Sequence, residues 1–184
     1  MVMTGRVQLY YKDVSDIVGG DGFSIVRLID ADEQRAICVI CDKEMSDQLS
    51  IRHKRLPGRE QMLPEVLVSM LLDEGPNDLE LMVYDVSDGK YGVTLLNRRT
   101  LSLKSIRMSD AVLLHYISKI PFYMDEDLVR RQSIPYTPDT SGLSIPINTL
   151  DTKWLNKELQ KAIEKEDYRL AANLNDELKK RTQS

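Results

Sequence analysis

The chain of 184 residues has few aromatic side chains, only two cysteines and no long apolar segment. Aromatic residues make up 6% of it and include a single tryptophan, so the core must consist mostly of Leu, Ile, Val and Met. Two cysteines exclude a disulfide framework. The longest apolar stretches, such as residues 66–72, are far shorter than the roughly 20 residues that a membrane-spanning helix needs.

Neither basic nor acidic side chains are in large excess. The chain carries 25 basic and 29 acidic side chains, a net charge of -4, so any contact with nucleic acid must come from a local patch. The first five residues lack the apolar core of a signal peptide. We therefore predict a cytoplasmic location, where thiols stay reduced.

Hydrophobic residues make up 42% of the chain, which is enough for a packed core. Strand-like patterns occur at residues 7–11, 23–29, 36–40, 79–86, 91–96, 101–106 and 120–124. Helical patterns occur at residues 42–52, 64–71, 111–118 and 125–131, with Ser109 as the expected N-cap of the third. The strands and helices do not alternate regularly, which predicts an α+β fold with a mixed or antiparallel sheet and a few packed helices.

Residues 132–149 differ in composition from the rest of the chain, because they contain three prolines, a glycine and several Ser and Thr. Such a segment cannot sustain a helix and is typical of a linker. We therefore divide the chain into an α+β domain (1–131), a linker (132–150) and a C-terminal α-helical hairpin (151–184).

The predicted hairpin has two short amphipathic helices, at residues 154–163 and 168–178. Two helices alone cannot bury all of their apolar side chains, so the remaining face needs a second surface. We predict that this surface is a second copy of the chain, or a partner protein's hairpin. The side chains expected to bind the partner are Leu155, Leu159, Tyr168, Leu174 and Leu178.

The hairpin sequence resembles the UVR motif, the helical hairpin at which excision-repair proteins meet. The resemblance covers Leu155-Asn156-Lys157-Glu158-Leu159 and the segment from Glu166-Asp167-Tyr168 through Ala171-Ala172 to Asp176-Glu177-Leu178. It implies a module that binds another protein.

The first 130 residues resemble the bifunctional nuclease domain. The strongest match is Ile106-Arg107-Met108-Ser109-Asp110-Ala111 followed by Ile120-Pro121-Phe122-Tyr123, and Asp88-Gly89-Lys90-Tyr91 matches a hairpin of that family. The resemblance implies a nuclease that acts on DNA or RNA.

Phosphodiester hydrolysis commonly uses carboxylates that hold Mg²⁺ or Mn²⁺. Asp110, Glu65 and Glu44 lie near the starts of predicted helices and are the candidate catalytic residues. Each also has a purely structural interpretation. Asp110 would pair with Ser109 or Arg107, and Glu65 and Glu44 would be solvated helix charges.

Basic side chains that could contact phosphates lie in and beside the loop that follows residue 51. The candidate nucleic-acid-binding residues are Arg52, Lys54, Arg55, Arg59 and Arg107. An ordinary solvated loop explains the first four equally well. Cys38, Cys41 and His115 are expected to be buried core residues.

Two functions follow as alternatives. The first is a nuclease, assisted by Mg²⁺ or Mn²⁺, with a hairpin that binds a partner. The second is a non-catalytic adaptor whose hairpin docks another protein, which the acidic charge balance favours.

Overall fold

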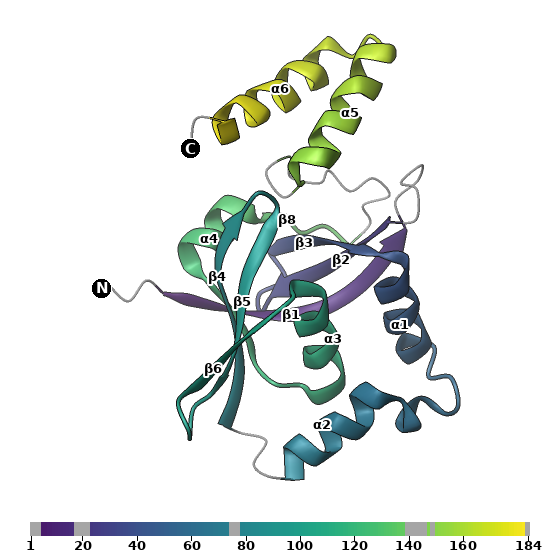
Figure 1. Ribbon diagram of the computed structural model, residues 1–184, viewed down its shortest axis with the longest axis vertical. Coiled ribbons are helices and arrows are strands. Elements are labelled where there is room, and N and C mark those ends of the chain that lie inside the picture. Colours follow the sequence, from purple (N-terminus) through teal and green to yellow (C-terminus); the bar gives the residue numbers. More distant parts are fainter. Residues whose placement is uncertain (1–4, 17–22, 74–77, 139–146, 148–149, 183–184) are drawn as a thin grey trace.

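The computed structural model describes residues 5–16, 23–73, 78–138, 147 and 150–182. One curved sheet with helices packed against it forms the main body, and two C-terminal helices form a hairpin at one end of the molecule (Figure 1). This arrangement confirms the predicted α+β class and the C-terminal helix pair.

The sheet has eight strands in the order β6-β5-β4-β7-β1-β2-β3-β8. They are β1 (Arg6–Asp16), β2 (Phe23–Asp30), β3 (Arg35–Asp42), β4 (Leu79–Ser87), β5 (Lys90–Asn97), β6 (Ser102–Ile106), β7 (Phe122–Asp125) and β8 (Ile134–Pro135). β4 and β7 run parallel, and the other neighbouring strands run antiparallel. The sheet is therefore mixed.

The centre of the core lies where β7 enters between β1 and β4. Phe122 of β7 is opposite Leu9 of β1 on one side and Leu81 of β4 on the other. All three side chains are almost completely buried. Because β1 and β4 come from distant parts of the chain, this row of large apolar groups joins the two halves of the sheet.

Helices pack on the sheet and extend beyond it. They are α1 (Lys43–His53), the short 3-10 helix η1 (Arg59–Gln61), α2 (Leu63–Asp73), α3 (Met108–Ser118), α4 (Glu126–Gln132), α5 (Thr152–Glu164) and α6 (Tyr168–Thr182). α3 contacts β1, β3 and β5, which are far apart in the sheet order, so the sheet curves around this helix. Ala111 and Val112 lie on the buried face of α3.

Side-chain caps set the starts of several helices. Asp42 accepts from the Met45 backbone N–H at 2.9 Å at the start of α1, and Asp167 accepts from the Leu170 N–H at 3.1 Å at the start of α6. The prediction that Ser109 caps α3 is wrong. The cap position is two residues earlier, at Arg107, and no side chain accepts a capping hydrogen bond from the backbone N–H groups of the first turn.

The hairpin has its own small core, in which Leu155, Ala162, Ala171 and Leu174 are buried. Ile40 of β3 packs against this core. The single tryptophan, at position 154, meets Phe23 edge to face with ring centroids 5.4 Å apart. Residues 139–146 and 148–149 of the predicted linker lie outside the described residues.

Candidate functional site

The starts of α1 and α3 bring acidic side chains to one pocket. Asp42 caps α1, Glu44 lies in the first turn of α1, and Asp110 lies in the first turn of α3. With Arg107, they line a pocket of about 440 Å³. The other lining residues are Met45, Gln48, Met62, Leu63, Pro64, Ser109 and Leu113. Two of the three predicted catalytic carboxylates, Glu44 and Asp110, thus share a pocket, and Asp42 joins them.

Arg107 lies among these carboxylates. Its Nε donates to Asp110 Oδ2 at 2.7 Å and its Nη2 donates to Asp110 Oδ1 at 3.0 Å. The hydrogen bond to Asp110, helped by attraction from Asp42 and Glu44, raises the pKa of Arg107 above its ordinary value. The side chains of Arg107 and Asp110 are 76% and 37% exposed, so the pair is screened by solvent and can open to a charged ligand.

A second pocket, of about 580 Å³, adjoins the first, because Arg107 and Ser109 line both. The remainder of its lining is Val39, Ile40, Gly89, Lys90, Tyr91, Ser105, Ile106 and Met108. The uncapped start of α3 supplies backbone N–H donors and the positive end of the helix dipole at this junction. One side of the α3 start is therefore acidic, and the other carries the cations Lys90 and Arg107.

Glu65, the third predicted catalytic carboxylate, is held elsewhere. It accepts two hydrogen bonds from Arg52, at 2.6 and 2.7 Å. Arg52 is 3% exposed, and its Nη1 also donates to the backbone and side-chain oxygens of Gln48. The interpretation of Glu65 as a solvated helix charge is therefore wrong, because its carboxylate pairs with a buried arginine. The expectation that Arg52 contacts nucleic acid is also corrected, because its charge is enclosed.

The other basic residues of the loop remain accessible. Lys54 and Arg55 are exposed between α1 and η1, whereas Arg59 is partly buried and pairs with Glu60 at 3.0 Å. Their predicted role in nucleic-acid binding stays a prediction. Arg107 lies in the carboxylate pocket, apart from this loop in the sequence.

The hairpin uses most of its predicted partner-binding residues internally. Leu155 and Leu174 are fully buried, and Leu159 and Leu178 are partly buried against them. Burial in the hairpin core removes Leu155 and Leu174 from any partner surface, which corrects that part of the prediction. Tyr168, 70% exposed, remains available to a partner.

Asp88, in the turn between β4 and β5, anchors the hairpin. Its Oδ1 accepts from Thr152 Oγ1 at 2.6 Å, from the Thr152 N–H at 3.2 Å and from Arg181 Nη1 at 3.0 Å. The hydrogen bonds from Thr152 lower the pKa of Asp88. The next residue, Gly89, has a positive φ of 70°, and a Cβ there would lie 2.6 Å from the Asp151 nitrogen. This turn therefore fits closely under the start of α5, a role that its Asp-Gly sequence alone did not indicate.

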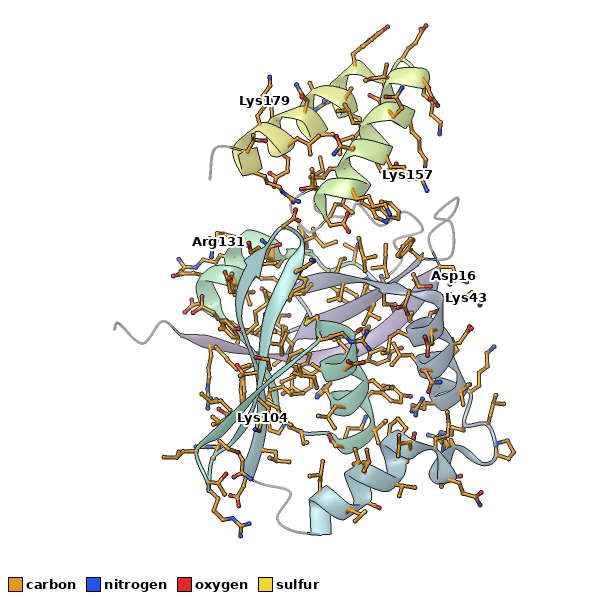
Figure 2. All side chains as sticks on the ribbon, in the orientation of Figure 1. Asp16, Lys43, Lys104, Arg131, Lys157 and Lys179 are labelled. Carbon is orange, nitrogen blue, oxygen red and sulfur yellow. The ribbon has the colours of Figure 1, made fainter. Side chains whose placement is uncertain are left out.

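Figure 2 shows charged side chains on both parts of the molecule. Lys157 and Lys179 extend from the hairpin helices, and Lys104 lies on β6 (Figure 2). Asp16 at the end of β1 lies near Lys43 at the start of α1 (Figure 2), and Lys43 pairs with Asp47 at 2.9 Å.

The cysteines and His115 are core residues, as predicted. Cys38 and Cys41 are buried free thiols, and burial raises their pKa values to about 11 and about 12. His115 is buried with its Nδ1 2.8 Å from the Ile120 carbonyl oxygen, and desolvation lowers its pKa.

In the part of the chain that the structure describes, no group of three or more His, Cys, Asp or Glu side chains is arranged to hold a metal ion. None of the helices in these residues is both long and apolar enough to cross a membrane. The chain matches no model of a known protein family, and no curated protein matches it.

Proposed function

We propose that this protein hydrolyses phosphodiester bonds of nucleic acid at the start of α3. The observation that carries the proposal is the joining of two pockets at Arg107 and Ser109, with carboxylates in one and Lys90 in the other. A substrate phosphate needs cationic and N–H donors, and cleavage needs groups that handle a proton and a hard cation. Both sets of groups line the two pockets that adjoin at Arg107 and Ser109.

The phosphate is bound by Arg107 and by the first backbone N–H groups of α3. A guanidinium can bind a phosphate with two parallel hydrogen bonds, and a helix start favours an anion. Because both Arg107 and Asp110 are exposed, a substrate phosphate can replace Asp110 as the partner of Arg107. This exchange releases the Asp110 carboxylate into the pocket that Glu44 also lines.

The carboxylates suit Mg²⁺ or Mn²⁺, which prefer oxygen ligands. Mg²⁺ often takes only one or two protein carboxylates and completes its coordination with water and substrate phosphate. Glu44 and Asp110, which line the same pocket, would hold such an ion. When bound, the ion supplies charge stabilisation and acidifies a water molecule. Asp42, the third carboxylate that lines the pocket, would accept the proton of the attacking water.

We place this activity in the cytoplasm, where thiols such as Cys38 and Cys41 stay reduced. Lys54 and Arg55 would hold the backbone of the bound nucleic acid outside the pocket.

The test is cleavage of labelled single- and double-stranded DNA and RNA with Mg²⁺, Mn²⁺ or EDTA. We expect divalent-metal-dependent cleavage that Glu44→Gln and Arg107→Gln each reduce by about 10²-fold or more. The matched control is Asp47→Asn, which removes an exposed charge of α1 that pairs with Lys43. Absence of cleavage under all conditions, or equal rates for Glu44→Gln and Asp47→Asn, would contradict the proposal.

A second candidate function is that of an adaptor, which one feature of the hairpin favours. Ile163, Tyr168 and Leu170, around the turn between α5 and α6, are 48%, 70% and 38% exposed. Exposed apolar groups at a helix turn suit contact with another protein. If the protein cleaves no nucleic acid but binds a partner that Tyr168→Ala releases, the adaptor function is the correct one.

A further inference from the structure

Tyrosines of three neighbouring strands lie on the face of the sheet that points away from the core. On β7, Tyr123 stands between two completely buried residues, so its side chain points to the opposite face. Tyr10 of β1 and Tyr84 of β4 each follow a buried residue and are 39% and 54% exposed. The sheet curves around α3 (Figure 1), and both α3 and α4 contribute buried residues to the core on the inner side. We call the face that carries the three tyrosines the outer face.

The strand register places these tyrosines on one diagonal of the outer face. Tyr123 pairs with Gln8 of β1 on one side and with Met82 of β4 on the other. Tyr10 lies two residues beyond Gln8, and Tyr84 lies two residues beyond Met82. Because β1 runs antiparallel to β7 and β4 runs parallel to it, the two steps point in opposite directions along β7. Diagonal neighbours on adjacent strands are about 7–8 Å apart, so the three rings follow one another in a row.

A guanidinium covers the middle of this row. The Cζ atom of Arg6 lies 4.1 Å from the centroid of the Tyr123 ring, which is a cation–π contact. Arg6 Nη1 donates to both carboxylate oxygens of Glu80, at 3.0 and 3.2 Å, and Arg98 Nη1 lies 3.9 Å from the same carboxylate. Glu80 is 7% exposed, whereas the side chains of Arg6 and Arg98 are 46% and 60% exposed. One enclosed carboxylate thus orients two accessible cations, and these three groups together carry a positive charge.

The combination of planar and cationic groups identifies the class of ligand. Nucleobases stack on aromatic rings and on guanidinium planes, and arginine pairs with the phosphates between them. Sheets that recognise single strands in this way stack two or three bases on aromatic side chains of one face. In a duplex the bases are stacked on one another, so only a single strand can present them to such a row.

We propose that the outer face of β1, β7 and β4 binds single-stranded nucleic acid. Bases stack on Tyr10, on Tyr84 and on the guanidinium that covers Tyr123. Arg98 contacts a phosphate beside this row. The surface is separate from the start of α3, because α3 packs on the inner side of the sheet. The binding therefore does not require cleavage at α3 and can be measured in its absence.

The test is the fluorescence anisotropy of labelled oligo-dT and oligo-U, with EDTA present so that no metal-dependent cleavage intervenes. We expect the unaltered protein to bind these single strands about tenfold or more tightly than a DNA duplex of the same length. Tyr10→Ala combined with Tyr84→Ala should weaken single-strand binding by about tenfold or more, because two stacking surfaces are lost. The slope of log affinity against log salt should not change in this variant, since no charge is removed.

Matched variants separate stacking from other effects of these residues. Tyr10→Phe combined with Tyr84→Phe keeps both rings and should retain the affinity of the unaltered protein. Arg98→Gln should lower the salt slope by roughly 0.7, the value for one phosphate of a single strand. Tyr168→Ala removes a 70% exposed tyrosine of the hairpin and should leave both affinity and slope unchanged.

Two results of these measurements would overturn the proposal. One is equal single-strand affinity for the unaltered protein and for Tyr10→Ala combined with Tyr84→Ala. The other is an equal loss of affinity in Tyr168→Ala. If the double alanine variant instead changes the molar mass measured by light scattering and binds single strands normally, the outer face contacts protein and the proposal is wrong.

Photocross-linking tests the contact without any substitution, so it decides the case even if a variant fails to fold. A single strand that carries iodouracil should become attached to Tyr10, Tyr84 or Tyr123 of the unaltered protein, as read from its peptides by mass spectrometry. Attachment confined to the loop after α1 or to the α5–α6 hairpin would overturn the proposal.

Discussion

Arg52 of α1 and Glu65 of α2 form a two-point ion pair, with Nε and Nη2 of the arginine 2.6 and 2.7 Å from the two carboxylate oxygens. The arginine side chain is 2% exposed and the glutamate 16%. This buried pair connects two helices across the loop that contains Lys54 and Arg55, and it fixes α2 beside the carboxylate pocket.

Glu65→Gln should destabilise the fold by about 3 kcal/mol, because it leaves the Arg52 guanidinium buried without its counter-charge. Urea unfolding followed by circular dichroism measures this loss. The double variant Arg52→Met, Glu65→Leu removes both charges and should cost less than Glu65→Gln alone. A double variant that is less stable than Glu65→Gln would show that the ion pair is not the main contribution of Arg52 and Glu65 to the free energy of unfolding.

Asp88→Ala should release the hairpin from the main body, because one carboxylate holds both Thr152 and Arg181. Trp154, the only tryptophan, packs on Phe23, so its fluorescence should shift toward that of a water-exposed indole. Asp85→Ala, which removes an exposed carboxylate of β4 near the turn, is the control and should leave the spectrum unchanged.

The Asp88 contact should also depend on pH. The folded state lowers the pKa of this carboxyl from 3.8, mainly through the Thr152 hydroxyl. The contact is therefore fully present above about pH 4 and is lost as the pH falls through the lowered value. A Trp154 signal that changes equally in the Asp88→Ala variant over this acidic range would assign the transition to another group.

Cys38 and Cys41 should resist alkylation in the folded protein. Burial raises their pKa values from 9.0 to about 11 and about 12, so few thiolates form at pH 8, and access is blocked. In the protein unfolded by urea, the same two thiols should react much faster. The same shifts imply that their contribution to stability is complete below pH 9 and is lost as the pH rises through about 11 for Cys38 and about 12 for Cys41. Rapid labelling of the native protein would show that β3 opens easily.

Nucleic-acid binding should show the contribution of the exposed loop cations. Replacing Lys54 and Arg55 together by Gln should reduce the slope of log affinity against log salt by about two, one for each phosphate contact. Lys153→Gln with Lys165→Gln, which removes two exposed hairpin cations, should leave the slope unchanged. Equal slopes for the unaltered protein and both double variants would show that Lys54 and Arg55 do not contact nucleic acid.

The regular elements could be predicted because their patterns are local. The alternation of apolar and polar residues predicted β4 and β5, and an apolar stripe predicted α5, each within a few residues of the observed bounds. The partners of charged residues could not be predicted, since they depend on tertiary contacts. Glu65 and Arg52 are 13 positions apart, and Asp88 and Arg181 are 93 apart.

The burial of apolar faces also depends on tertiary contacts. The hairpin was expected to expose its apolar groups, but packing between α5 and α6 and against Ile40 buries Leu155 and Leu174. The apolar residues of the predicted helix at 64–71 include Val66, Leu67, Met70 and Leu71, which are 41% to 62% exposed. Periodicity indicates which residues share a face, whereas the tertiary fold decides what covers that face.

We propose that the start of α3 is the cleavage site and that Glu65 has a structural role through its pair with Arg52. The most direct measurement compares the metal-dependent cleavage rates of Asp110→Asn and Glu65→Gln, each corrected for its folded fraction. We predict that Asp110→Asn abolishes cleavage while its thermal midpoint stays within a few degrees, and that folded Glu65→Gln retains most of the activity. Full activity of Asp110→Asn, with loss of activity in folded Glu65→Gln, would contradict the account.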